Sequence, residues 1–149
     1  MATTHVAGDT RPTTRSWLIA APIAGMVGYL IAAAVNVAND TGGGDQGSSD
    51  WAIAIAISAV LTAAAIGFGL RAAKHGAGSM ATTAIVLGVL GVVGIVVFWT
   101  GLPAIFGAAA VALSLAARQA AGSFPGPAVV GLVLGAVALV MGLSTMVVG

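Results

Sequence analysis

The sequence has no cysteine and no glutamate, and it carries few charges of either sign. Of its 149 residues, 6% are charged and 59% are hydrophobic. Without cysteine, the chain cannot form disulfides, thiolate metal sites or cysteine nucleophiles. Soluble domains carry about 25% charged residues, so this chain cannot cover itself with a water-exposed surface. We therefore expect most of its surface to contact lipid or another apolar partner.

Residues able to support chemistry are also scarce. The net charge of +1 provides no basic field, so we expect no nucleic-acid partner. His5 and His75 fall in polar segments, and a metal site needs three or four convergent ligands. The apolar runs contain no ionisable residue that would indicate a proton relay or a transport path. We predict no catalytic, cofactor-binding or metal site, and hence no enzyme.

Hydroxyl groups are the remaining polar groups inside the apolar runs. Such groups can line a transport path, but they usually bond to carbonyls of their own helix, and we expect the second arrangement here. The hydroxyl residues concerned are Ser58, Thr62, Ser114, Ser144 and Thr145.

What the chain does contain is five apolar runs, which predict an all-α bundle of membrane-spanning helices. A helix rises about 1.5 Å per residue, so about 20 residues cross a hydrocarbon core of about 30 Å. The first run is longer than the roughly 7–15 residues of a signal-peptide core, so we expect it to be retained. The expected helices are 17–37, 51–70, 80–98, 103–117 and 128–148.

Polar segments divide the chain into a tail and one transmembrane domain. Residues 1–16 form the tail, and residues 17–149 form the domain, with a first hairpin (17–79) and a glycine-rich three-helix part (80–149). The segment 39–50 holds three of the four aspartates, but their spacing does not match a calcium loop. We expect it to be a solvated loop.

The positions of the charges predict the topology. All five cations fall in the tail or in the second and fourth connections, so the positive-inside rule predicts a cytoplasmic N-terminus and an external C-terminus in the plasma membrane. Tryptophans at predicted helix ends suit the two membrane interfaces. The expected interface anchors are Trp17, Trp51, Trp99, Arg71 and Arg118.

Small residues at helical spacing predict where helices approach closely, because association in lipid relies on packing of backbones. On the second helix they recur at steps of three or four and form one stripe, which we predict to be a packing seam. Ile53, Ile57 and Val60 would then face lipid or a partner. The predicted packing residues are Ala52, Ala56, Ala59, Ala63, Gly67, Gly88, Gly91, Gly131 and Gly135.

The third and fifth helices align without gaps, as Ile85-Val-Leu-Gly88 with Leu132-Val-Leu-Gly135. Internal duplication and chance similarity of two low-complexity helices both remain open. A family resemblance of residues 80–148 rests on these two motifs, on Gly101-Leu-Pro-Ala-Ile-Phe-Gly107 and on Arg118. The segment resembles a domain family of unknown function in small actinobacterial multi-pass membrane proteins, and the Ala/Gly/Val-rich composition suits such a genome. The family implies no activity, cofactor or site.

Two functions fit these features. The first is a non-catalytic accessory or structural subunit of a larger bacterial membrane complex, such as a respiratory or cell-envelope assembly, with integral membrane subunits and lipid as partners. The second is a small transporter, channel or lipid-binding protein that works as a homo-oligomer. The polar tail and the small-residue seams would serve as contact surfaces in the first case, and the seams would serve self-association in the second.

Overall fold

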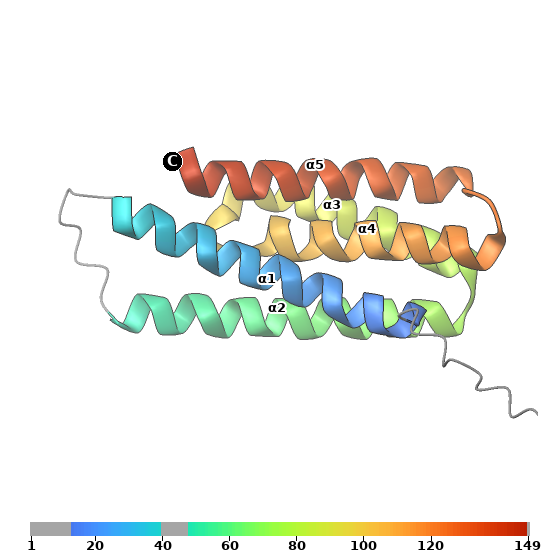
Figure 1. Cartoon of the computed structure of the whole chain (residues 1–149), viewed down its shortest axis with the longest axis horizontal. Helices are drawn as coiled ribbons and strands as arrows, with labels where there is room; N and C mark the ends of the chain where they lie inside the picture. Colours follow the sequence, from blue (N-terminus) through green and yellow to red (C-terminus); the bar gives the residue numbers. More distant parts are fainter. Residues whose placement is uncertain (1–12, 40–47, 149) are drawn as a thin grey trace, which may run out of the picture.

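Five long helices and one short 3₁₀ segment make up the described part of the chain, residues 13–39 and 48–148 of a computed structural model (Figure 1). Each of the five α-helices is long and apolar enough to cross a membrane, and the described residues contain no strand. The predicted all-α, five-helix membrane bundle is therefore confirmed. The elements are α1 (Thr14–Asn39), α2 (Ser48–Lys74), α3 (Ala77–Val93), η1 (Gly94–Thr100), α4 (Leu102–Ala121) and α5 (Gly126–Val148).

Three of the predicted helix ends were wrong. The second helix does not end at residue 70 but continues to Lys74, so only His75 and Gly76 connect it to α3. The third helix does not continue to residue 98, because Gly94 and the β-branched residues after it favour the α-helix poorly and the chain becomes 3₁₀ there. The fourth helix does not end at residue 117. Arg118 and Gln119 are good helix formers, and the helix ends only at Gly122, which takes the left-handed conformation with φ 73°.

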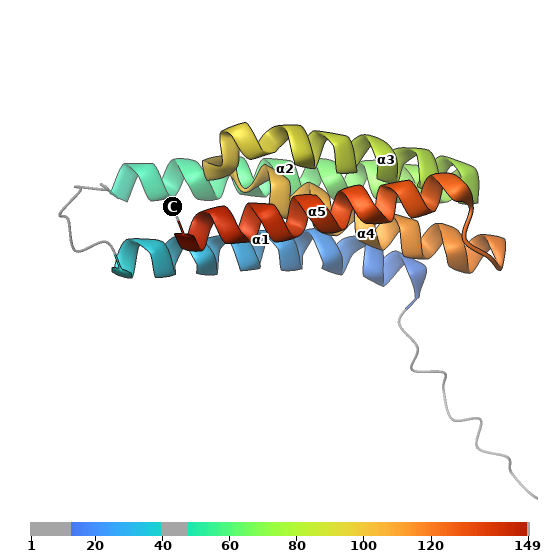
Figure 2. The ribbon, with the colours of Figure 1, turned by 90° about the horizontal axis from the view of Figure 1, so that it is seen from above.

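Helix α4 is the centre of the bundle, and α1, α2, α3 and α5 all pack against it (Figures 1 and 2). It is the most enclosed of the five spans, with 61% of the residues in its most apolar 18-residue stretch buried. Small side chains on every side of α4 let four helices approach its backbone. Its buried small residues are Ala104, Gly107, Ala108, Ala109, Ala110, Ala112, Ser114, Ala116 and Ala117.

The larger of two clusters of buried side chains draws on all five helices. It contains Leu18 of α1, Ala65 of α2, Ala84 of α3, Leu113 of α4 and Ala128 of α5, and the smaller cluster lies between α1 and α4. Helix α1 packs more extensively against α4 than against α2. The first two helices therefore lie against the glycine-rich part and form one domain with it.

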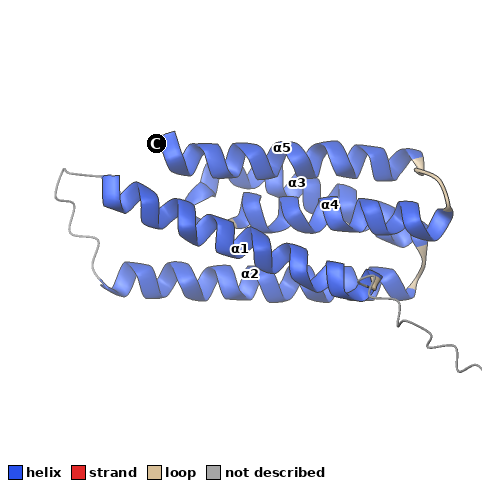
Figure 3. Ribbon diagram, in the orientation of Figure 1, coloured by secondary structure: helices blue, strands red, loops and turns tan. Residues whose placement is uncertain are grey.

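The described cations gather at one end of the bundle. The start of α1, the end of α2 and the end of α4 lie at the same end, where two short connections join α2 to α3 and α4 to α5 (Figure 3). Arg15, Arg71, Lys74 and Arg118 belong to these helix ends. We call this the cation end. Asp50, the one acidic residue of the described ranges, lies in the first turn of α2 at the opposite end.

Candidate functional site

The predicted glycine seam between α3 and α5 is present. Gly88, Gly131 and Gly135 are buried. A Cβ atom added at Gly88 would lie 2.8 Å from Cβ of Leu134, and one added at Gly131 would lie 2.7 Å from Cβ of Ala84. No real Cβ fits at such distances, so these glycines bring the two helices together, as predicted.

The seam extends from α3 and α5 onto α4. A Cβ at Gly91 would lie 2.9 Å from Cβ of Ala138. Gly107 of α4 faces Gly135 of α5, and a Cβ on Gly107 would lie 2.7 Å from both the Gly135 carbonyl oxygen and the Leu139 nitrogen. Backbone touches backbone here, so all the predicted glycines of this part lie inside the molecule, and none of them is free to contact a partner.

Three further close approaches escaped the sequence analysis. A Cβ at Gly25 of α1 would lie 2.6 Å from the Ala104 carbonyl oxygen, and one at Gly142 of α5 would lie 2.7 Å from Cβ of Pro103. Gly101 has φ 72°, and a Cβ added to it would lie 2.7 Å from Cδ1 of the Tyr29 ring. Helices α1 and α5 carry the signal that could have revealed two of these contacts. Gly25 lies in the repeat Ala21, Gly25, Gly28, Ala32 of α1, and Gly142 continues the repeat Gly131, Gly135, Ala138 of α5.

The predicted small-residue stripe on α2 does not pack against the other helices of this chain. Ala52, Ala56, Ala59, Ala63 and Gly67 are all exposed, and a Cβ at Gly67 would meet no atom within 4 Å. Small-residue periodicity identifies a stripe on a helix, but it does not identify the side from which the neighbours approach. We call this stripe the α2 outer face.

Helix α2 uses a second small-residue stripe to contact the bundle. Its buried residues are Ser58, Thr62, Ala65, Gly69 and Ala72, at steps of four, three, four and three. This stripe contains two hydroxyls, which drew attention away from it as a packing surface. The helix therefore presents small residues on two faces, and the more polar one faces inward.

The buried hydroxyls are bonded within their own helices, as predicted. Ser58 Oγ donates to the Ala54 carbonyl at 2.8 Å and also lies 3.5 Å from the Thr100 carbonyl of η1, and Thr62 Oγ1 donates to the Ser58 carbonyl at 2.7 Å. Ser114 Oγ donates to the Ala110 carbonyl at 2.9 Å. Ser144 and Thr145 likewise donate to carbonyls of α5. Across the described part of the chain, no buried side-chain nitrogen or oxygen lacks a hydrogen bond.

The expected interface anchors lie at helix ends. Trp17 is in the first turn of α1 and Trp51 is in the first turn of α2, at opposite ends of the bundle. Arg71 and Arg118 are exposed in the last turns of α2 and α4. The side chain of Trp99, and most of the 39–50 loop and the 1–16 tail, lie outside the described residues.

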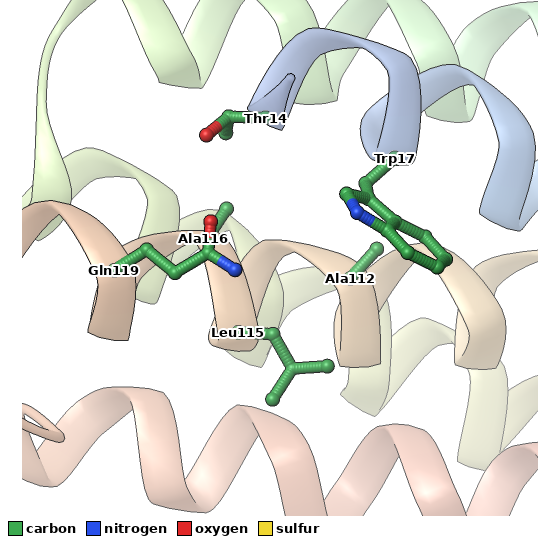
Figure 4. Close-up of a pocket in the computed structure, with 6 residues that line it drawn as sticks. All are labelled: Thr14, Trp17, Ala112, Leu115, Ala116 and Gln119. Atoms are coloured by element: carbon green, nitrogen blue, oxygen red, sulfur yellow. The ribbon is translucent and has the colours of Figure 1, made fainter. Parts of the chain in front are cut away.

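A small cleft opens beside Trp17 at the cation end (Figure 4). It has a volume of about 180 Å³. Thr14 and Trp17 of α1 face α4 across it, and Leu115 points away toward α5 (Figure 4). We call it the Trp17 cleft; its lining residues are Thr14, Trp17, Ala112, Leu115, Ala116 and Gln119.

The described residues bring no metal-binding set together, since no three of their His, Asp and Glu side chains form a group. No family model, curated protein or solved structure matches the chain. The resemblance of residues 80–148 to a family of small membrane proteins thus stays a prediction. Two surface features of the described residues are candidate contact sites: the α2 outer face and the Trp17 cleft.

Proposed function

We propose that this protein is a non-catalytic accessory subunit of a larger bacterial membrane complex, and that it docks onto another integral subunit through the α2 outer face. The observation that carries the proposal is the exposure of the whole Ala52–Gly67 stripe. Small residues at this spacing allow another helix to approach closely, which drives association between helices in lipid.

The other small-residue seams are already occupied. Gly88, Gly91, Gly131 and Gly135 contact neighbouring helices of the same chain. Helix α2 is among the least covered spans, with 22% of the residues in its most apolar 18-residue stretch buried. Large apolar side chains flank its stripe and would enclose a partner helix; these are Ile53, Ile57, Val60 and Phe68.

The proposed orientation places the cation end in the cytoplasm and the C-terminus outside, in the plasma membrane. The clustering of Arg15, Arg71, Lys74 and Arg118 at one end supports it, because cytoplasmic loops carry the excess of Lys and Arg. Trp17 and Trp51 would then lie at the two interfaces.

Co-purification tests the proposal. The chain is purified from its native membranes in mild detergent, as wild type and as the Ala59→Leu/Ala63→Leu variant. Both residues are exposed, so the variant should fold, while its leucines keep a partner helix away. We expect wild type to bring down a second integral membrane protein and the variant to lose it. A wild-type chain that purifies alone as a single monomeric species would overturn the proposal.

The matched control makes the same two substitutions on another exposed face. Ala20 and Ala24 of α1 are both exposed and lie four residues apart like Ala59 and Ala63, so Ala20→Leu/Ala24→Leu adds the same apolar bulk outside the stripe. This variant should keep the partner. Loss of the partner from both variants would contradict docking through α2.

The second candidate is a homo-oligomer, in which the α2 outer faces of two copies pair. A two-fold interface uses the same patch on both subunits, and the stripe meets this requirement because its small residues run along the helix. In this case the wild-type chain co-purifies only with itself. The transporter, channel or lipid-binding role would then be tested by solute flux or ligand binding in liposomes.

A further inference from the structure

The Trp17 cleft exists because two helices that cover α4 separate toward the cation end. Helices α1 and α5 meet in the other half of the bundle, where a Cβ at Gly28 would lie 3.7 Å from Leu143. From there α1 runs away from α5, and the end of α4 is visible between them (Figure 1). Leu115 is exposed here, although most of α4 is buried.

The lining of the Trp17 cleft is divided between apolar and polar groups. Ala112, Leu115 and Ala116 give it an apolar floor. The hydroxyl of Thr14 and the carboxamide of Gln119 lie at its end nearest to the cation end (Figure 4). Neither side chain has a hydrogen bond to another described residue, so both are available to a ligand.

Among the described residues, the charged side chains next in sequence to the polar lining residues of the Trp17 cleft are both cationic. Arg15 follows Thr14 and Arg118 precedes Gln119, and both arginines are exposed. The Arg118 guanidinium lies 4.7 Å from the centre of the Phe124 ring, which holds it beside the last turn of α4. Asp50 is at the opposite end of the bundle, so no acidic side chain of the described ranges opposes these cations.

We infer that the Trp17 cleft binds one anionic phospholipid. An acyl chain would lie on Ala112, Leu115 and Ala116, in contact with the Trp17 ring. The phosphate would accept hydrogen bonds from Thr14 and Gln119 and pair with Arg15 and Arg118. The apolar floor extends along the helices while the polar groups stay at the helix ends, and this order matches the order of tail and headgroup in a bilayer leaflet. The site lies on α1 and α4, so it does not depend on docking through α2.

Quenching of Trp17 fluorescence tests the inference. The full-length Trp51→Phe/Trp99→Phe chain keeps one tryptophan, and it is reconstituted in phosphatidylcholine vesicles. Small fractions of acyl-brominated phosphatidylglycerol or acyl-brominated phosphatidylcholine are then added. We expect the anionic lipid to quench Trp17 at a lower mole fraction than the zwitterionic lipid. Equal quenching by both lipids, or no quenching by either, would overturn the inference.

Two charge-matched variants separate the site from a general surface effect. In this background, Arg15→Gln/Arg118→Gln removes the cations beside the Trp17 cleft. Arg71→Gln/Lys74→Gln removes two cations of the same end from α2. We expect the first variant to lose about fivefold of its preference for anionic over zwitterionic lipid for each arginine removed. This is the typical contribution of one cation near an anionic membrane surface. The second should keep the preference. An equal loss in both variants would contradict a defined site.

Discussion

Individual glycines set the distances between the helices of this bundle. Gly88, Gly107, Gly131 and Gly135 each lie where a Cβ would come within 3 Å of an atom in another helix. Lipid gives helices no hydrophobic reason to associate, so dispersion contacts between close backbones must hold them together. These contacts depend on the missing side chain, and one added methyl is enough to separate the helices.

Gly107→Ala should destabilise the bundle by about 1–3 kcal/mol, the usual cost of overpacking a well-packed site. The added Cβ would meet the backbone of Gly135 and Leu139 at 2.7 Å, and backbone atoms cannot rotate away. Thermal unfolding in detergent, followed by circular dichroism, measures the change. Gly67→Ala is the control, since nothing lies within 4 Å of its Cβ. Equal melting temperatures for Gly107→Ala and wild type would refute the role of Gly107.

Substitutions at a second pair of glycines distinguish the stability cost of backbone strain from that of a steric clash. Gly101 and Gly122 have φ 72° and 73°. A Cβ added at Gly101 would contact the Tyr29 ring, whereas one added at Gly122 would meet no atom within 4 Å. Gly122→Ala should cost about 1–2 kcal/mol, because an L-residue is strained in this conformation. Gly101→Ala should cost more, and Tyr29→Ala should reduce the excess. The same unfolding assay gives the three values. Identical losses for the two glycine variants would show that the Tyr29 contact adds nothing.

Each helix has a different role in the bundle. Helix α4 is enclosed by the other four, α3 and α5 contact it through glycines, and α1 and α2 cover its remaining sides. Helix α2 carries five small residues on an outer stripe as well as small residues on its inner stripe. An outer stripe makes no contact inside this chain, so packing of the bundle alone does not require small residues there.

Replacing an alanine of α2 with leucine should therefore lower stability in the inner stripe but not in the outer stripe. Ala65 is buried in the inner stripe, so Ala65→Leu should destabilise the isolated chain by about 1–3 kcal/mol. Its melting temperature should fall accordingly. Ala63→Leu in the outer stripe should leave it unchanged. Unfolding of the two purified variants in detergent makes the comparison. A fall in melting temperature for Ala63→Leu would show that the outer stripe contacts this chain.

The number of helices and the packing of α3 against α5 could be predicted from the sequence. Five apolar runs define five helices because a span needs about 20 apolar residues, and paired glycines on α3 and α5 define a seam because both helices repeat the pattern. The inner side of α2 could not be predicted, since Ala59 and Ala65 are equally small. The Trp17 cleft could not be predicted either. It arises from the divergence of α1 and α5, which no local pattern encodes.

The molecule as a whole is asymmetric along its long axis. Arg15, Arg71, Lys74 and Arg118 lie at the cation end, and the C-terminal end of α5 lies at the other (Figure 1). Five spans would place the two ends of the chain on opposite sides of the membrane. Short loops with Lys and Arg stay in the cytoplasm, so the charges favour one of the two orientations.

Cysteine labelling should report this orientation, because the chain has no cysteine of its own. Gly122→Cys places a thiol in the exposed connection between α4 and α5. An impermeant maleimide should label it only after the cells are permeabilised, whereas a cysteine in a C-terminal tag should be labelled in intact cells. Labelling of Gly122→Cys in intact cells would reverse the proposed topology.

Cross-linking at the α2 outer face in native membranes is the most direct test of the proposed docking. Ala59→Cys introduces a single thiol into the exposed stripe, and Val133→Cys introduces one into the exposed side of α5 as the control. A short thiol-to-amine or photoactivated cross-linker is then applied to intact membranes. The account predicts that Ala59→Cys forms one discrete adduct with a second integral membrane protein and that Val133→Cys forms none. An Ala59→Cys chain that remains uncross-linked, or one that gives the same adduct as Val133→Cys, would contradict it.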